Sequence, residues 1–166
     1  DLLCKPATDT PCCAIHVAFV YSLGDNKILG DIMSDLSESQ KMKMLTVRAK
    51  HRGAYPIHFA AGNIAYGYEQ FMMIDDFKAD HKLELLRLVD DNGETALHTV
   101  ARNSSGHNII KVMRKWFHTH ESWMEYMNLF SIHGLTALHI AFCSTSNPKV
   151  IETIFALCSP NERLRL

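Results

Sequence analysis

The sequence predicts an all-α fold, a solenoid of about four helical repeat units, and two observations carry that prediction. One is a recurring motif: Gly93-Glu94-Thr95-Ala96-Leu97-His98 returns as Gly134-Leu135-Thr136-Ala137-Leu138-His139. It returns in altered form as Gly53-Ala54-Tyr55-Pro56-Ile57-His58, and more faintly before His16. The other is the nearly constant interval between the motif histidines, which stand at positions 16, 58, 98 and 139. In such repeats each unit buries its apolar face against the next unit.

Each position of the motif has a physical role. The glycine suits a tip turn, because it accepts positive φ without steric penalty. Threonine suits the N-cap of the helix that follows, and Pro56 suits its first position. The histidine is expected to be buried and bonded to loop backbone and, where present, to the threonine hydroxyl. The structural residues of the repeat are therefore expected to be His16, Gly53, His58, Gly93, Thr95, His98, Gly134, Thr136 and His139.

The chain divides into units at 8–49, 50–89, 90–130 and 131–166, eight residues before each histidine. First helices are expected at 14–21, 56–63, 96–103 and 137–143, and second helices at 27–36, 68–77, 108–118 and 148–157. Three further segments, 39–48, 80–89 and 121–130, carry apolar residues at helical spacing. An additional short helix in each unit would explain why the period is as long as about 41 residues.

The motif resembles the signature of the ankyrin-repeat family, Thr-Pro-Leu-His-x-Ala. The resemblance is carried by 55–61, Tyr-Pro-Ile-His-Phe-Ala-Ala, and by both Thr-Ala-Leu-His copies. Gly106-His107, followed by the hydrophobic segment 108–113, supplies the repeat's second landmark. Two features depart from the family. The family's period is shorter, at about 33 residues, and the first copy has Pro11 and Cys13 where glycine and threonine belong.

The resemblance implies a concave face, lined by the tips and the first helices, that binds a protein or peptide. The variable tips are 50–52, 90–92 and 132–133, and the variable helix positions lie four and five residues after each histidine. Arg102 is expected to be exposed there and to contribute less than about 0.5 kcal/mol to stability. The resemblance names these partner-binding candidates: Tyr21, Arg52, Asn63, Asp91, Asn92, Arg102, Asn103, His133 and Ser144.

Composition argues against several other classes of function. A net charge of −1 provides no electrostatic attraction for nucleic acid or an anionic membrane. No apolar run approaches the ~20 residues of a transmembrane helix, so we expect no membrane contact by this segment. The N-terminal residues lack a signal-peptide layout. Five cysteines without a CxxC pair indicate neither a disulfide framework nor a zinc site, and therefore an intracellular protein on the cytoplasmic side.

Two clusters could suggest chemistry, and both are interpreted as structural. His118 and His120 lie two residues apart and point to different sides of a helix, so joint metal coordination is awkward. His139 and Cys143 have the i, i+4 spacing of a Cys–His pair, but no orienting Asp or Asn and no oxyanion loop lies nearby. We therefore expect no enzyme, no metal and no cofactor.

The leading expectation is a module for protein–protein interaction. The alternative is a non-catalytic targeting or regulatory segment of a larger channel, enzyme or pathogen effector. Leu2-Leu3 and 163–166 resemble the segments that lead into the next unit. Neither end has a polar terminal repeat, so we expect further repeats or domains on either side.

Overall fold

The structure is a computed structural model that describes residues 13–21, 27–144 and 148–163. Within these residues the regular elements are α-helices, twelve in number. They are α1 Ala14–Val20, α2 Lys27–Ser34, α3 Glu38–Leu45, α4 Pro56–Gly62, α5 Gly67–Met72, α6 Ala79–Leu86, α7 Ala96–Arg102, α8 His107–Lys115, α9 His120–Met127, α10 Ala137–Ser144, α11 Pro148–Ala156 and α12 Pro160–Arg163. The fold of the described chain is therefore all-helical.

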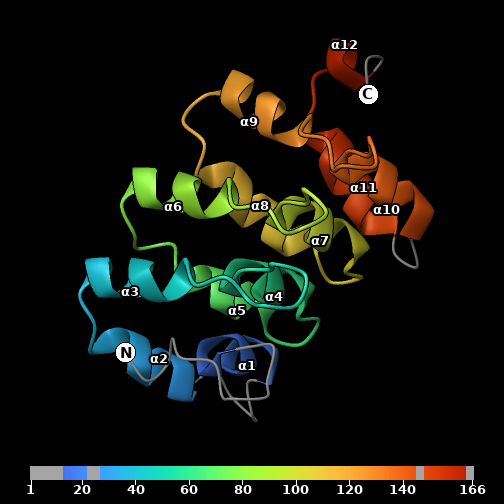
Figure 1. Cartoon of the computed structure of the whole chain (residues 1–166). Helices are drawn as coiled ribbons and strands as arrows, with labels where there is room; N and C mark the ends of the chain where they lie inside the picture. The colour runs from blue at the N-terminus through green and yellow to red at the C-terminus, as the bar shows by residue number, and fades with distance from the viewer. Residues whose placement is uncertain (1–12, 22–26, 145–147, 164–166) are drawn as a thin grey trace.

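The helices follow one another in four sets of three, which we call units 1 to 4 (α1–α3, α4–α6, α7–α9 and α10–α12). First helices contact one another in chain order, α1 with α4, α4 with α7 and α7 with α10. Second helices do the same from α5 to α8 and from α8 to α11. Figure 1 shows the units placed in chain order from bottom to top, with α3, α6 and α9 along one side.

The helices expected from the motif form close to their predicted positions, and the third segment of each unit is also helical. The main difference is α5, which ends at Met72 instead of continuing to residue 77. Beyond it the amide of Ile74 donates to the Phe71 carbonyl, and that of Phe77 donates to the Ile74 carbonyl. Because these hydrogen bonds span three residues instead of four, the segment continues as turns and not as α-helix. Ile74 and Phe77 are both buried in this conformation.

The tips of units 2 to 4 are short turns, each closed by a backbone hydrogen bond across the motif glycine. Gly53, Gly93 and Gly134 have φ of 60°, 67° and 71°, as predicted, in the region that favours glycine. Neighbouring tips are also joined to each other. The amide of Asp91 donates to the Arg52 carbonyl over 2.9 Å, and that of Ile132 donates to the Asn92 carbonyl over 2.9 Å.

The motif histidines join the start of their own helix to backbone later in the chain, and for His58 and His98 that backbone belongs to the next unit. In units 1 to 3 the Nδ1 atom accepts the backbone N–H of the N-cap residue, which leaves the proton on Nε2. From there His16 donates to the Val47 carbonyl, His58 to the Glu94 carbonyl and His98 to the Leu135 carbonyl, over 2.9, 2.9 and 3.1 Å. These three rings are buried, as predicted.

His139 departs from that expectation because it is exposed. Its Nδ1 atom still contacts the N-cap residue, Thr136, at 2.7 Å from the hydroxyl and 3.3 Å from the amide. In the described part of the chain its Nε2 atom has no hydrogen-bond partner. His58 and His98 differ in that the acceptor for this atom, at Glu94 and Leu135, comes from the following unit.

The core runs continuously through all four units. Between units 2 and 3, Phe71 stacks on Trp116 with ring centroids 5.7 Å apart. Phe117, Trp123 and Tyr126 form an aromatic cluster beside it. This core fixes the first helices and the tips, which carry the candidate site.

Candidate functional site

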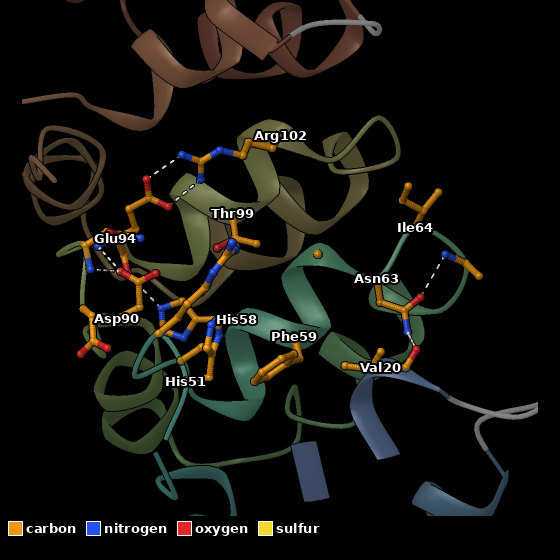
Figure 2. Close-up of a pocket in the computed structure, with 16 residues that line it drawn as sticks. Val20, His51, His58, Phe59, Asn63, Ile64, Asp90, Glu94, Thr99 and Arg102 are labelled. Carbon is orange, nitrogen blue, oxygen red and sulfur yellow. Dashed lines mark hydrogen bonds and ion pairs between the residues drawn. The ribbon is translucent and has the colours of Figure 1, made fainter. Parts of the chain in front are cut away.

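A groove of about 1200 Å³ lies across the first helices and tips of units 1 to 3. Figure 2 shows the side chains that line it, with α4 in the middle and α7 on one side. The lining residues come from the end of α1, from two tips, from α4 with the loop after it, and from α7. They are Val20, His51, Arg52, Ala54, His58, Phe59, Gly62, Asn63, Ile64, Ala65, Asp90, Asp91, Asn92, Glu94, Thr99 and Arg102.

One end of the groove is apolar. Ile64 is 63% exposed, Val20 is 41% exposed and Phe59 is half-buried. All three line the groove, and Figure 2 places them on the same side of it. Neighbouring apolar side chains that stay exposed on a surface rimmed by polar groups are typical of binding surfaces.

The opposite end is polar and is shaped by the tips of units 2 and 3. Asp90 Oδ1 accepts the backbone N–H groups of Asn92 and Glu94, each over 2.9 Å, which holds the second of these tips. Asp91 pairs with Arg48 over 2.6 Å, and both side chains are about half exposed, at 52%. Arg48 also donates to the Gly53 carbonyl, so this ion pair connects the two tips.

A bidentate ion pair joins the tip of unit 3 to the end of α7. The two terminal guanidinium nitrogens of Arg102, Nη1 and Nη2, donate to the carboxylate of Glu94, each over 2.6 Å. The Glu94 side chain is only 9% exposed, whereas that of Arg102 is 45% exposed. The hydrogen bonds from Arg102 hold the pKa of the Glu94 carboxyl below its usual range. Because Glu94 is a buried carboxylate, its partner Arg102 has a structural role. The sequence-based expectation that Arg102 contributes little to stability did not include this role.

Two asparagines predicted as binding residues instead connect successive units. Asn103 is 5% exposed; its Nδ2 donates to the Ala61 carbonyl over 2.9 Å, and its Oδ1 accepts the amide of Ser105 over 2.9 Å. Asn63 makes the equivalent bond to the Phe19 carbonyl over 2.9 Å and is half-buried. Asn103 therefore lies outside the accessible surface, which corrects its place among the binding candidates. Asn63 remains on the groove wall.

The other predicted residues separate into two groups. Arg52, Asp91, Asn92 and Arg102 line the groove together with Asn63. Tyr21, His133 and Ser144 are exposed but do not line it. The prediction missed Phe59, Ile64, Glu94 and Thr99. Phe59 and Thr99 directly follow the motif histidines, and this position could have been added to the variable ones.

His58 is the one motif histidine on the groove wall within the part of the chain that the structure describes. Burial lowers its pKa below the usual range. Its Nδ1 accepts the Tyr55 amide over 3.2 Å, and its Nε2 donates to the Glu94 carbonyl. Both nitrogens are thus engaged in holding the fold, and neither is available to exchange a proton with a bound molecule.

Among 13–21, 27–144 and 148–163, no three His, Cys, Asp or Glu side chains gather closely enough to hold a metal ion. None of the described helices has the length and apolar character needed to cross a membrane. No protein-family model matches the chain, and no curated protein matches its sequence.

Proposed function

We propose that the chain is an ankyrin-like helical-repeat solenoid that binds a protein or peptide partner in the groove of Figure 2. The Gly-x-Thr-x-Leu-His motif and the contacts that His58 and His98 make with the next unit support the repeat assignment. The binding assignment is carried by one observation, the groove that combines exposed apolar side chains with polar tips.

The composition of the groove favours a polypeptide ligand. Its volume of about 1200 Å³ exceeds the roughly 300–1,000 Å³ that is usual for small-molecule pockets. Exposed Ile64 and Val20 offer apolar area at one end, and Arg52 and Asn92 offer polar groups at the other. An extended peptide or a loop of a folded protein can place an apolar side chain and polar backbone groups at these two ends together.

We further propose that binding involves no catalysis and no cofactor. Several ionisable groups of the groove already hold structural contacts, namely the Glu94–Arg102 pair, the Asp91–Arg48 pair and His58. The net charge of −1 favours a protein over a nucleic acid as the partner. The unpatterned cysteines favour the reducing, cytoplasmic side of the cell.

The experiment compares two isoleucines with almost the same exposure. Ile64 lies in the groove and is 63% exposed, and Ile28 lies on α2 outside the groove and is 64% exposed. Peptides would be selected from a random display library with the whole chain as bait, and their affinity measured by calorimetry. Ile64→Asp is expected to weaken binding at least tenfold, about 1.4 kcal/mol, because it places a carboxylate against the apolar end.

Ile28→Asp is the matched control, since it adds the same charge and removes the same side chain elsewhere. It is expected to leave the affinity unchanged. Equal affinities for both variants and the parent would show that selected peptides bind outside the groove, and the proposed function would then fail.

A further inference from the structure

Arg52 differs from the other arginine on the groove wall in that its charge is not paired. Arg102 is bonded through both terminal nitrogens to Glu94. Arg52 is exposed and lines the groove beside the exposed His51. Within residues 13–21, 27–144 and 148–163 its side chain has no ion-pair or hydrogen-bond partner. The groove therefore contains a guanidinium group that is free to bind a ligand.

The carboxylates that line the groove are already bonded within the fold. Asp90 Oδ1 accepts two backbone amides of its own tip. Asp91 is paired with Arg48 over 2.6 Å, and Glu94 is paired with Arg102 over 2.6 Å. A cationic ligand would find these oxygens engaged, whereas an anionic ligand would find the unpaired Arg52. The bonding pattern of the groove thus favours a negatively charged group on the ligand.

Gly53 helps to keep Arg52 unpaired. A Cβ atom at Gly53 would clash with Asp91 Oδ1 and with Arg48 Nη2, so the missing side chain leaves room for this ion pair above the tip. Asp91 is consequently bonded to Arg48 and not to its nearer neighbour along the tips, Arg52, although the backbones of Arg52 and Asp91 are in direct contact.

The backbone that carries the guanidinium of Arg52 is fixed by the fold. Its φ of 63° lies in the left-handed region, which is costly for arginine. The Arg52 carbonyl accepts the amide of Asp91 over 2.9 Å, which holds this conformation. A ligand therefore meets a cation whose main chain is already ordered, and this lowers the entropic cost of binding.

We propose that Arg52 selects ligands that carry a carboxylate, namely peptides with a Glu or Asp side chain near an apolar one. The inference rests on the proposed function, because it specifies the chemistry of the partner that occupies the same groove. The planar guanidinium matches a carboxylate in a bidentate geometry. One unpaired guanidinium suits a singly charged carboxylate, whereas sites for phosphorylated peptides typically gather several arginines.

The distance between the two groups of the ligand follows from α4, which lies between Arg52 and the apolar end at Ile64. Figure 2 places His51 on one side of α4 and Ile64 on the other. The seven residues of α4 span about 10 Å, at about 1.5 Å per residue. An extended peptide covers this distance in about three or four residues. The acidic and apolar side chains are expected at that separation.

The test uses the whole chain and two matched sets of synthetic peptides. Each peptide has a leucine and, at the expected separation, Glu in one set and Gln in the other, with the remaining positions varied identically. Binding is measured on peptide arrays, and the best pairs are measured by calorimetry. We expect the Glu peptide to bind at least about fivefold more tightly than its Gln partner. Arg52→Gln should remove this preference by weakening the Glu peptide alone.

Lys50→Gln is the matched control. Lys50 is exposed two residues before Arg52 but does not line the groove, so the variant removes the same charge outside the site. It should keep the preference for Glu. The assignment to Arg52 is overturned if both variants lose the preference equally, or if Arg52→Gln retains it.

The parent chain also distinguishes this inference from the proposed function. If peptides bind and are weakened by Ile64→Asp, but the Glu and Gln members of each pair bind equally, the groove keeps its function and the inference about Arg52 alone is wrong. If no peptide binds, or if binding is insensitive to Ile64→Asp, the proposed function fails and the inference fails with it.

Discussion

His98 donates its Nε2 hydrogen to the carbonyl of Leu135, 3.1 Å away and 37 residues later in the chain. The other nitrogen of the same ring accepts the Thr95 amide at the start of α7, over 3.1 Å. One neutral imidazole therefore both caps its own helix and holds the tip of the next unit. His58 does the same between units 2 and 3, where it accepts the Tyr55 amide and donates to the Glu94 carbonyl.

His98→Ala is expected to destabilise the fold by about 1–3 kcal/mol, because it leaves the buried Thr95 amide without its partner and removes one of the two hydrogen bonds to the Leu135 carbonyl. The measurement is urea unfolding of the variant and the parent. His139→Ala is the control, since this ring is exposed and its Nε2 has no partner among the described residues. The predicted role of His98 fails if the two variants lose the same stability.

The stability of the fold is expected to decrease as the pH falls from 7.5 to 5.5. Burial lowers the pKa of His58 and of His98, against a smaller opposing effect of their hydrogen bonds to backbone carbonyls and of nearby carboxylates such as Glu94. Below the ordinary histidine value of about 6.5 the unfolded chain binds protons that the folded chain does not, so protonation favours unfolding. Each histidine contributes at most about 1.4 kcal/mol per pH unit to this slope.

Urea unfolding at several pH values measures the slope, and His98→Gln provides the comparison. Glutamine keeps an amide near the same partners but does not titrate in this range. The variant should therefore show a shallower dependence on pH than the parent, whatever its stability at pH 7.5. A stability that is constant from pH 7.5 to 5.5 would contradict the prediction for the parent.

The sequence predicted the helices well because the motif combines a turn glycine, an N-cap and apolar spacing, which are all local signals. Gly93 and Thr95 could be assigned for that reason, and the structure places them as expected. The burial of Asn103 could not be predicted, since its partner is the Ala61 carbonyl, 42 residues earlier. The exposed Ile64 likewise belongs to the groove only because of where the fold places the loop after α4.

The Glu94–Arg102 pair also depends on three-dimensional placement, and it leads to a prediction. Arg102→Ala is expected to destabilise the chain by about 1–3 kcal/mol, because it leaves the carboxylate of Glu94 buried without its two hydrogen bonds. Since Arg102 holds the pKa of Glu94 below its usual range, this contribution is present above about pH 4.3 and is lost as the pH falls through the folded-state value.

A double-mutant cycle in urea separates this effect from the loss of the arginine side chain alone. Glu94→Gln removes the charge but keeps the shape, so Arg102→Ala should be less harmful in that background. Arg102→Lys should restore only part of the stability, because an ammonium group cannot match the bidentate geometry. Additive single substitutions would show that the pair has no net coupling.

Replacing Arg52 is expected to increase the stability of the chain, in contrast to the substitutions of His98 and Arg102. It has a φ of 63°, a left-handed conformation that disfavours side chains other than those of Gly, Asn and Asp, and it lines the groove. Arg52→Asn should therefore stabilise the chain by about 0.5–1 kcal/mol in urea unfolding, because asparagine tolerates this conformation. Asn92→Arg is the reverse control at the equivalent position of the next tip, where φ is not positive. It should therefore change the stability little through backbone strain.

Residues held in a costly backbone conformation often serve binding. The more stable Arg52→Asn variant should accordingly bind groove-selected peptides more weakly than the parent, and a variant that is both more stable and equally strong in binding would remove Arg52 from the site.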